Sequence, residues 1–286
     1  MTMDSEPASG RLGLFSSSLS SSSGARSGGA FRPLLGVVIE TLRVAIDLVL
    51  PRTCPGCHAP VPWCEACAAT LQRRPRAVAL PEAALDRLAA AGLVLPTVHA
   101  LARYAGPVRA AIIAGKERGR RDLPPRLGAA LGAGLVALQD AAVLPPELWL
   151  VPAPTRRASA RARGGDPVAA MARMAAAVLA AHGRPAGVAP CLRLSGKVRD
   201  SVGLDAAARA ANLAGAVQFD ARAAPPPGAF TVLLDDVLTS GATVGGSCEA
   251  LAASGVTLGG VLVLAAVPSP RKPLLPASAR RRSVGP

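Results

Sequence analysis

The fold is decided by the stretch Phe230-Thr231-Val232-Leu233-Leu234-Asp235-Asp236-Val237-Leu238-Thr239-Ser240-Gly241-Ala242-Thr243. Its first five residues are largely apolar and predict a buried β-strand over Phe230–Leu234. Two adjacent carboxylates follow, and then a turn of small residues that leads into a helix predicted over Val244–Ser254. This order is typical of a parallel sheet, in which ligands bind beyond the carboxyl ends of the strands.

The turn after the carboxylates has the composition of an anion-binding loop. Its small side chains leave main-chain N–H groups accessible, and the N-terminus of the following helix adds positive potential. Hydroxyl groups supply further hydrogen-bond donors. The expected phosphate-binding residues are Thr239, Ser240, Gly241, Ala242 and Thr243.

The carboxylates Asp235 and Asp236 lie next to this loop in the sequence. They can accept hydrogen bonds from the hydroxyls of a ribose whose phosphate occupies the loop. A diphosphate ligand would need a cation to neutralise its charge, so we expect Mg²⁺ with it. The alternative is an Asp-containing turn before an ordinary capped helix. The ordered succession of strand, acids, hydroxyls and glycine favours the binding site.

The rest of the domain alternates short apolar runs with helical patterns, which predicts an α/β fold with a mostly parallel sheet flanked by helices. The predicted strands are 98–104, 148–151, 188–192, 230–234 and 261–267. The predicted helices are 34–50, 82–91, 108–115, 126–138, 167–182, 204–213 and 244–254. No G-x-x-x-x-G-K-[ST] sequence is present, which argues against an ATPase of the P-loop type.

Four cysteines form two C-x-x-C pairs, Cys54 with Cys57 and Cys64 with Cys67. Four thiolates close a tetrahedral zinc site and leave no open coordination position, so we expect a structural zinc ion in a small zinc-ribbon-like module. A redox pair, disulfides and an iron–sulfur cluster are the alternatives. Redox C-x-x-C motifs normally occur once, which favours zinc.

Composition separates the chain into a core and polar ends. Half of the residues are hydrophobic, and the net charge is +14, which favours phosphate-rich partners without choosing among them. The start of the chain has no apolar segment of the signal-peptide kind. The uncharged run 250–270 is broken by glycines, so we expect no membrane span and a cytoplasmic protein. The predicted segments are 1–33 disordered, 34–72 helix and zinc module, 73–96 connector, 97–270 main domain and 271–286 basic disordered tail.

The stretch 230–243 resembles the signature of type I phosphoribosyltransferases, with Ser240 at a position that is usually Thr. Together with the four cysteines, it resembles the ComF family of competence-associated, phosphoribosyltransferase-like proteins. The resemblance covers roughly residues 34–268. Further matches are Tyr104, Gly106, Lys116, Gly119, the segment Val151-Pro152-Ala153-Pro154, Leu204, Arg209 and Asn212.

The resemblance implies a phosphoribosyltransferase-type domain that binds phosphoribosyl pyrophosphate with Mg²⁺ and transfers the phosphoribosyl group to an acceptor. It implies that Asp235 and Asp236 are the catalytic acids, that Arg156 and Arg157 bind the diphosphate, and that Lys116 closes over the site. Gly165-Asp166-Pro167 stands where the family has Phe-Asn-Gln. This departure leaves open whether the chain is catalytically active.

Two alternatives from other functional classes remain. The first is a non-catalytic accessory protein of DNA uptake that binds single-stranded DNA or a competence helicase. The charge favours it and the scarcity of aromatic residues opposes it, since single-strand binders stack bases on aromatic rings, for which the cysteine module offers only Trp63. The second is a regulator that senses a nucleotide. Dimers are common in the fold, so a homodimer is also open.

Overall fold

The computed structural model describes residues 52–71, 74–94, 96–155, 165–195 and 216–268. These described residues belong to one compact unit, which contains both the four cysteines and the sheet. The helices are α2 (Glu65–Ala68), α3 (Glu82–Ala90), α4 (Gly106–Lys116), α5 (Leu123–Asp140), α7 (Pro167–Ala181) and α9 (Ala242–Ala253), with a 3₁₀ turn at Ala221–Ala223. The strands are β1 (Arg76–Val78), β2 (Val98–Arg103), β3 (Leu148–Pro152), β4 (Ala186–Val188), β5 (Leu192–Leu194), β6 (Val217–Phe219), β7 (Thr231–Leu238) and β8 (Leu258–Ala266).

The described residues form a six-stranded sheet in the order β1-β2-β8-β7-β3-β4. Five strands are parallel, and β1 pairs antiparallel with β2 at one edge. Strands β5 and β6 form a separate antiparallel pair. The predicted α/β class and mostly parallel sheet are therefore confirmed.

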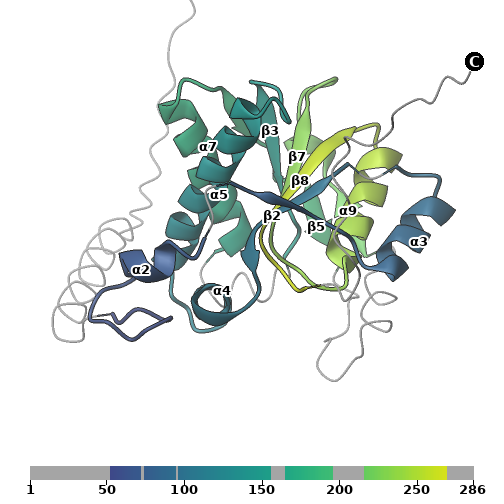
Figure 1. Ribbon diagram of the computed structural model, residues 1–286. Coiled ribbons are helices and arrows are strands. Elements are labelled where there is room, and N and C mark those ends of the chain that lie inside the picture. Colours follow the sequence, from purple (N-terminus) through teal and green to yellow (C-terminus); the bar gives the residue numbers. More distant parts are fainter. Residues whose placement is uncertain (1–51, 72–73, 95, 156–164, 196–215, 269–286) are drawn as a thin grey trace, which may run out of the picture. The chain divides into compact units, whose positions relative to one another are not determined.

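Helices cover both faces of the sheet because the chain reverses its direction of travel across it (Figure 1). From β2 through α4 and α5 to β3, and from β3 through α7 to β4, the chain moves toward the β4 edge. From β7 through α9 to β8 it moves back. Right-handed crossovers then place α5 and α7 on one face and α9 on the other, where α3 packs beside α9. The reversal occurs between the adjacent strands β3 and β7.

The helices α5 and α7 pack closely because glycines line their contact. A Cβ atom on Gly128 would lie 2.5 Å from the main-chain oxygen of Met171, and one on Gly132 would lie 2.6 Å from Cβ of Val178. Alanines on α7, among them the fully buried Ala172 and Ala175, have small side chains that allow the two helices to approach closely. This pair of helices packs against one face of the sheet.

The structure differs from the sequence prediction at several element boundaries. Strand β7 continues through both carboxylates to Leu238, because β8 pairs with it as far as Leu238↔Ala266. The single strand predicted over 188–192 is two short strands, β4 and β5, and β6 was not predicted. The segment 73–96, expected to be a connector, contributes β1 to the sheet and α3 to the layer beside α9.

Some predictions fall outside the described residues: the head 1–33, the helix 34–50, the helix 204–213 and the tail 271–286. Within the described ranges, no helix combines the length and the apolar character needed to cross a membrane.

Candidate functional site

The two carboxylates lie near the carboxyl end of β7, beyond the last residue of the neighbouring strand β3. Strand β3 ends at Pro152, which pairs with Leu234, so Asp235 and Asp236 extend past β3 and have a paired strand only on the β8 side. The chain leaves β3 toward one face and β7 toward the other, and the carboxyl ends of two such strands form the usual ligand crevice of an open α/β sheet. The acids therefore stand at the topological switch point of this fold.

Asp236 is paired with the lysine that the sequence singled out. Lys116 is the last residue of α4, and its Nζ lies 2.9 Å from Oδ2 and 3.2 Å from Oδ1 of Asp236. The Asp236 side chain is 6% exposed, whereas that of Lys116 is 42% exposed. The structure thus brings together two predicted site residues that are 120 positions apart in the chain.

Asp235 is buried beside a second negative charge. Burial and, to a lesser extent, the charge of Asp236 together raise the pKa of Asp235 to about 8, although Lys116 and the main-chain amide of Asp236 act in the opposite direction. That amide donates a hydrogen bond to Oδ1 of Asp235 at 2.8 Å. Asp235 is therefore largely protonated near neutral pH until a cation or a hydrogen-bond donor reaches it.

The turn after β7 has unsatisfied donors. Among the described residues, the main-chain amides of Thr239–Thr243 have no hydrogen-bond partner, and neither do the three hydroxyls of this segment. Gly241 is the residue before α9 and has a φ of 73°, which is in the left-handed region. Thr239 is exposed, Ser240 and Thr243 are half-buried, and Gly241 and Ala242 are buried. Unpaired amides at a helix start suit an anionic group.

Asp166, which the sequence prediction did not use, joins Thr155 after β3 to the start of α7. Asp166 caps α7 by accepting hydrogen bonds from Val168 N and Ala169 N, and Thr155 donates to its other oxygen at 2.6 Å. An Asp followed by Pro at the start of an Ala-rich helix was the available signal. The expected diphosphate ligands Arg156 and Arg157 lie outside the described residues.

A cavity of about 160 Å³ lies between the α4–α5 turn and the start of α7. Gly115 and Gly119, which flank Lys116, line one side, and Asp166 lines another. Two cations, Arg121 and Arg173, also face it. The acidic pair and residues 239–243 are not among the residues that line this cavity.

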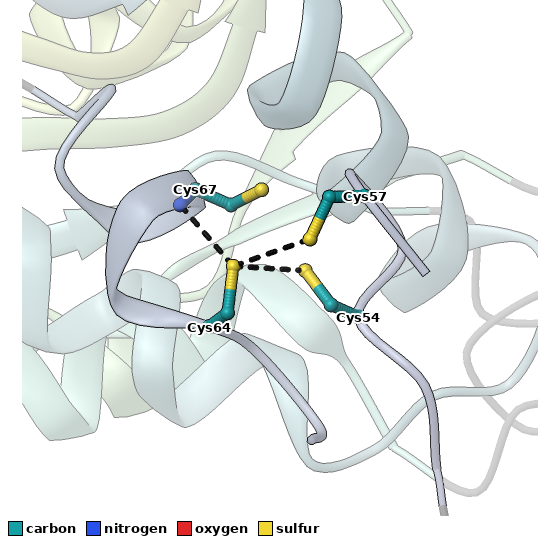
Figure 2. Close-up of side chains that lie close together, drawn as sticks. All are labelled: Cys54, Cys57, Cys64 and Cys67. Atoms are coloured by element: carbon teal, nitrogen blue, oxygen red, sulfur yellow. Dashed lines mark hydrogen bonds between the residues drawn. The ribbon is translucent and has the colours of Figure 1, made fainter. Parts of the chain in front are cut away.

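The four predicted cysteine ligands converge on one point (Figure 2). Their sulfur atoms all lie within 4.8 Å of one another, and Sγ of Cys64 is 3.4 Å from that of Cys57 and 3.7 Å from that of Cys54. In a tetrahedral site with Zn–S bonds of about 2.3 Å, the sulfurs lie roughly 3.8 Å apart. The cluster could therefore hold a metal ion such as zinc.

The surroundings of the cluster favour ionisation of one cysteine thiol, that of Cys54, but oppose ionisation of Cys67. Burial opposes ionisation of Cys54, but main-chain hydrogen bonds from Cys64, Cys57 and Gly56 outweigh it and lower the pKa of Cys54 to about 6. Burial and the neighbouring thiols raise the pKa of Cys67. Simultaneous ionisation of all four sulfurs therefore requires a bound cation, which is the behaviour of a structural metal site.

Neither the protein-family models nor the curated proteins contain a match for this chain. The interpretation of the site accordingly rests on its own residues. The structure brings Asp235, Asp236, Lys116 and residues 239–243 to one end of β7, and it places the four cysteines in a second cluster. Trp63 is half-buried and packs against the core.

Proposed function

We propose that this chain is a phosphoribosyltransferase-type protein, similar to the ComF family, that binds phosphoribosyl pyrophosphate at the carboxyl end of β7. The observation that carries the proposal is the sequence of groups at the switch point: two carboxylates that extend past β3, followed by five main-chain amides, Thr239–Thr243, that have no partner among the described residues.

The groups of this site match the parts of the ligand. The amides and hydroxyls of residues 239–243 would hold the 5′-phosphate, and Asp235 and Asp236 would accept hydrogen bonds from the ribose hydroxyls. Lys116 and, beyond the described residues, Arg156 and Arg157 would face the diphosphate. Such a division places each charge of the ligand against a group of opposite polarity.

Magnesium would arrive with the ligand. Among the described residues, the four cysteines are the only cluster of three or more metal-binding side chains, so the acidic pair alone does not build a protein cage for Mg²⁺. Mg²⁺ is commonly bound by one or two carboxylates together with substrate phosphates. When bound, it would neutralise the departing diphosphate.

Transfer would break the bond between ribose C1 and the diphosphate oxygen and form a bond between C1 and the acceptor. The electron pair of the broken bond leaves with pyrophosphate, and the acceptor loses its proton to solvent. The protein would contribute by orienting the ribose and by placing charged groups around the developing positive charge at C1 and the negative charge on the leaving group.

The test is calorimetric titration with phosphoribosyl pyrophosphate in Mg²⁺ and in EDTA, with ribose 5-phosphate, pyrophosphate and a single-stranded oligonucleotide as comparison ligands. We expect Mg²⁺-dependent binding by the wild type and its loss in the double variant Asp235→Asn, Asp236→Asn. Asp140→Asn is the matched control, since this acid lies at the far end of α5 and pairs with Arg184. Absence of Mg²⁺-dependent binding by the wild type would overturn the proposal, and salt-sensitive oligonucleotide binding alone would favour the accessory DNA-binding role.

A further inference from the structure

We infer that Arg120 is a positioning residue that anchors the α4–α5 turn to the four-cysteine module (residues 52–71) and thereby holds Lys116 against Asp236. The inference rests on the proposed function only for its consequence in ligand binding. The geometry on which it stands involves three parts of the chain that are distant in sequence: the module, the turn and β7.

Two side-chain hydrogen bonds of Arg120 join the turn to the module. Its Nη1 donates to the main-chain oxygen of Thr53 at 2.9 Å, and its Nη2 donates to that of Pro62 at 2.9 Å. Thr53 directly precedes Cys54, and Pro62 lies two residues before Cys64. One guanidinium therefore joins both cysteine pairs to the turn.

The same guanidinium is held in place by Asp122. Nε and Nη2 of Arg120 donate to the two oxygens of Asp122, each at 2.8 Å, and Arg52 donates to Oδ1 of Asp122 at 2.9 Å. Burial alone would raise the pKa of Asp122, but the hydrogen bonds and charge of Arg120 and Arg52 outweigh it and lower that pKa. A fork of this kind restricts the orientation of both side chains.

The turn transmits this anchoring to Lys116 through its main chain. The amides of Arg118 and Arg120 both donate to the oxygen of Ala114, and Gly119 takes a left-handed φ of 69° that closes the end of α4. Lys116 is the last residue of that helix. Displacement of Arg120 would therefore loosen the helix end from which Lys116 reaches Asp236.

The module also contacts the other end of α4. A Cβ atom on Gly56 would lie 2.7 Å from Cβ of Pro107, the second residue of α4, and 2.7 Å from Sγ of Cys67. Thus the first cysteine turn packs against the start of the helix and Arg120 secures its end. The module positions α4 as a whole, and Lys116 is the residue of α4 that reaches the acidic pair.

Amine footprinting tests the inference without any ligand. The chain has three lysines, Lys116, Lys197 and Lys272, so trace acetylation followed by mass spectrometry reports Lys116 against two internal references. In Arg120→Ala we expect Lys116 to react about two- to fivefold faster relative to the references, the change that corresponds to loss of a partly exposed ion pair. Asp236→Asn is the positive control. Arg184→Ala is the matched control, because Arg184 likewise joins a main-chain oxygen, that of Val136, to an acid, Asp140.

A double-mutant cycle on phosphoribosyl pyrophosphate binding tests the consequence. We expect Arg120→Ala to weaken binding several-fold in the wild-type background and to have no further effect in the Lys116→Ala background, a result that a general loss of stability would not give. Asp122→Asn replaces Arg120→Ala if the latter does not fold. Unchanged Lys116 reactivity in the folded variant, or equal effects in both backgrounds, would overturn the inference. If the wild type binds no ligand, the proposed function fails and the footprinting still decides the positioning role.

Discussion

Pro152 lies opposite Leu234 in the register of β3 and β7, and it is the last residue of β3. The next two residues of β7 are the acidic pair, so these candidate site residues extend past the end of the neighbouring strand. The site is created by this difference in strand length, and the predictions that follow concern the groups arranged around it.

The pH dependence of stability will report the burial of Asp235. An acid whose pKa is higher in the folded protein holds its proton more tightly there, so stability falls as pH rises from the unfolded pKa near 4 to the folded value of about 8. We expect Asp235→Asn to remove most of this decline, with its largest stabilising effect at and above pH 8. Thermal unfolding between pH 4.5 and 8.5 measures it. A parallel decline in the variant and the wild type would contradict the prediction, and Asp140→Asn serves as the control.

Gly241→Ala will disturb the loop before α9. The left-handed φ of 73° disfavours any side chain, and the new Cβ would lie 2.8 Å from Cβ of Ala84. We expect a loss of about 1–3 kcal/mol in the free energy of unfolding together with weaker phosphate binding. Gly245→Ala, one turn further along, is the control, because its Cβ would meet no heavy atom within 4 Å. Denaturant unfolding should find the control equal to or more stable than the wild type, and equal losses in both would refute the argument.

Cys64→Ser will abolish stoichiometric zinc binding. Sγ of Cys64 lies 3.7 Å from that of Cys54 and 3.4 Å from that of Cys57, so the loss of Cys64 leaves a cluster of three thiols. We expect about one zinc ion per wild-type chain by elemental analysis, and a tetrahedral thiolate spectrum after cobalt substitution. The buried Cys248, which lies on α9 outside the cluster, provides the control Cys248→Ser, which should keep the metal. Retention of zinc by Cys64→Ser would exclude the four-cysteine assignment.

Gly128→Ala will separate α5 from α7. The added methyl group would lie 2.5 Å from the main-chain oxygen of Met171, and a main-chain atom cannot move aside as a flexible side chain can. We expect a destabilisation of about 1–3 kcal/mol despite the better helix propensity of alanine. Chemical denaturation measures the change, and a variant as stable as the wild type would mean that the helices are not in close contact at this point.

Asp166→Ala will remove the N-terminal cap of α7. Because Asp166 accepts hydrogen bonds from Val168 N, Ala169 N and Thr155 Oγ1, we expect a loss of about 1–2 kcal/mol. Asp166→Asn should keep the cap and lose less. Comparison of the two variants by thermal unfolding separates the role of the hydrogen bonds from that of the charge.

Much of the fold followed from local patterns in the sequence. The helix predicted over 167–182 is α7, and the strand predicted over 98–104 is β2, since each has the apolar spacing of its element and a clear start or stop. The end of β7 was not predictable in this way. Aspartate is disfavoured in strands, yet pairing with β8 carries the strand through Asp235 and Asp236.

The sequence predicted which residues form the candidate site, but not the hydrogen bonds that join the site to the rest of the chain. The order of groups after Leu234 predicted the acids and the loop as a binding site, and the spacing of the four cysteines predicted the cluster that the structure contains. The contacts of Arg120 with Thr53 and Pro62 were not visible, because they join residues 67 and 58 positions apart and follow from how the cysteine module packs on α4. Such long-range hydrogen bonds leave no periodic signal in a sequence.

The packing of Gly56 against Pro107 bears on how the chain can be divided for expression. Composition suggests that the chain could be cut after Leu71, at the end of a separate zinc-binding unit. Such a cut would remove Gly56, which packs on α4 at Pro107, and would also remove Thr53 and Pro62, whose main-chain oxygens accept hydrogen bonds from Arg120. Truncated chains that begin at residue 74 should therefore be poorly soluble, whereas chains that begin before Arg52 keep the contacts between the four-cysteine module and α4.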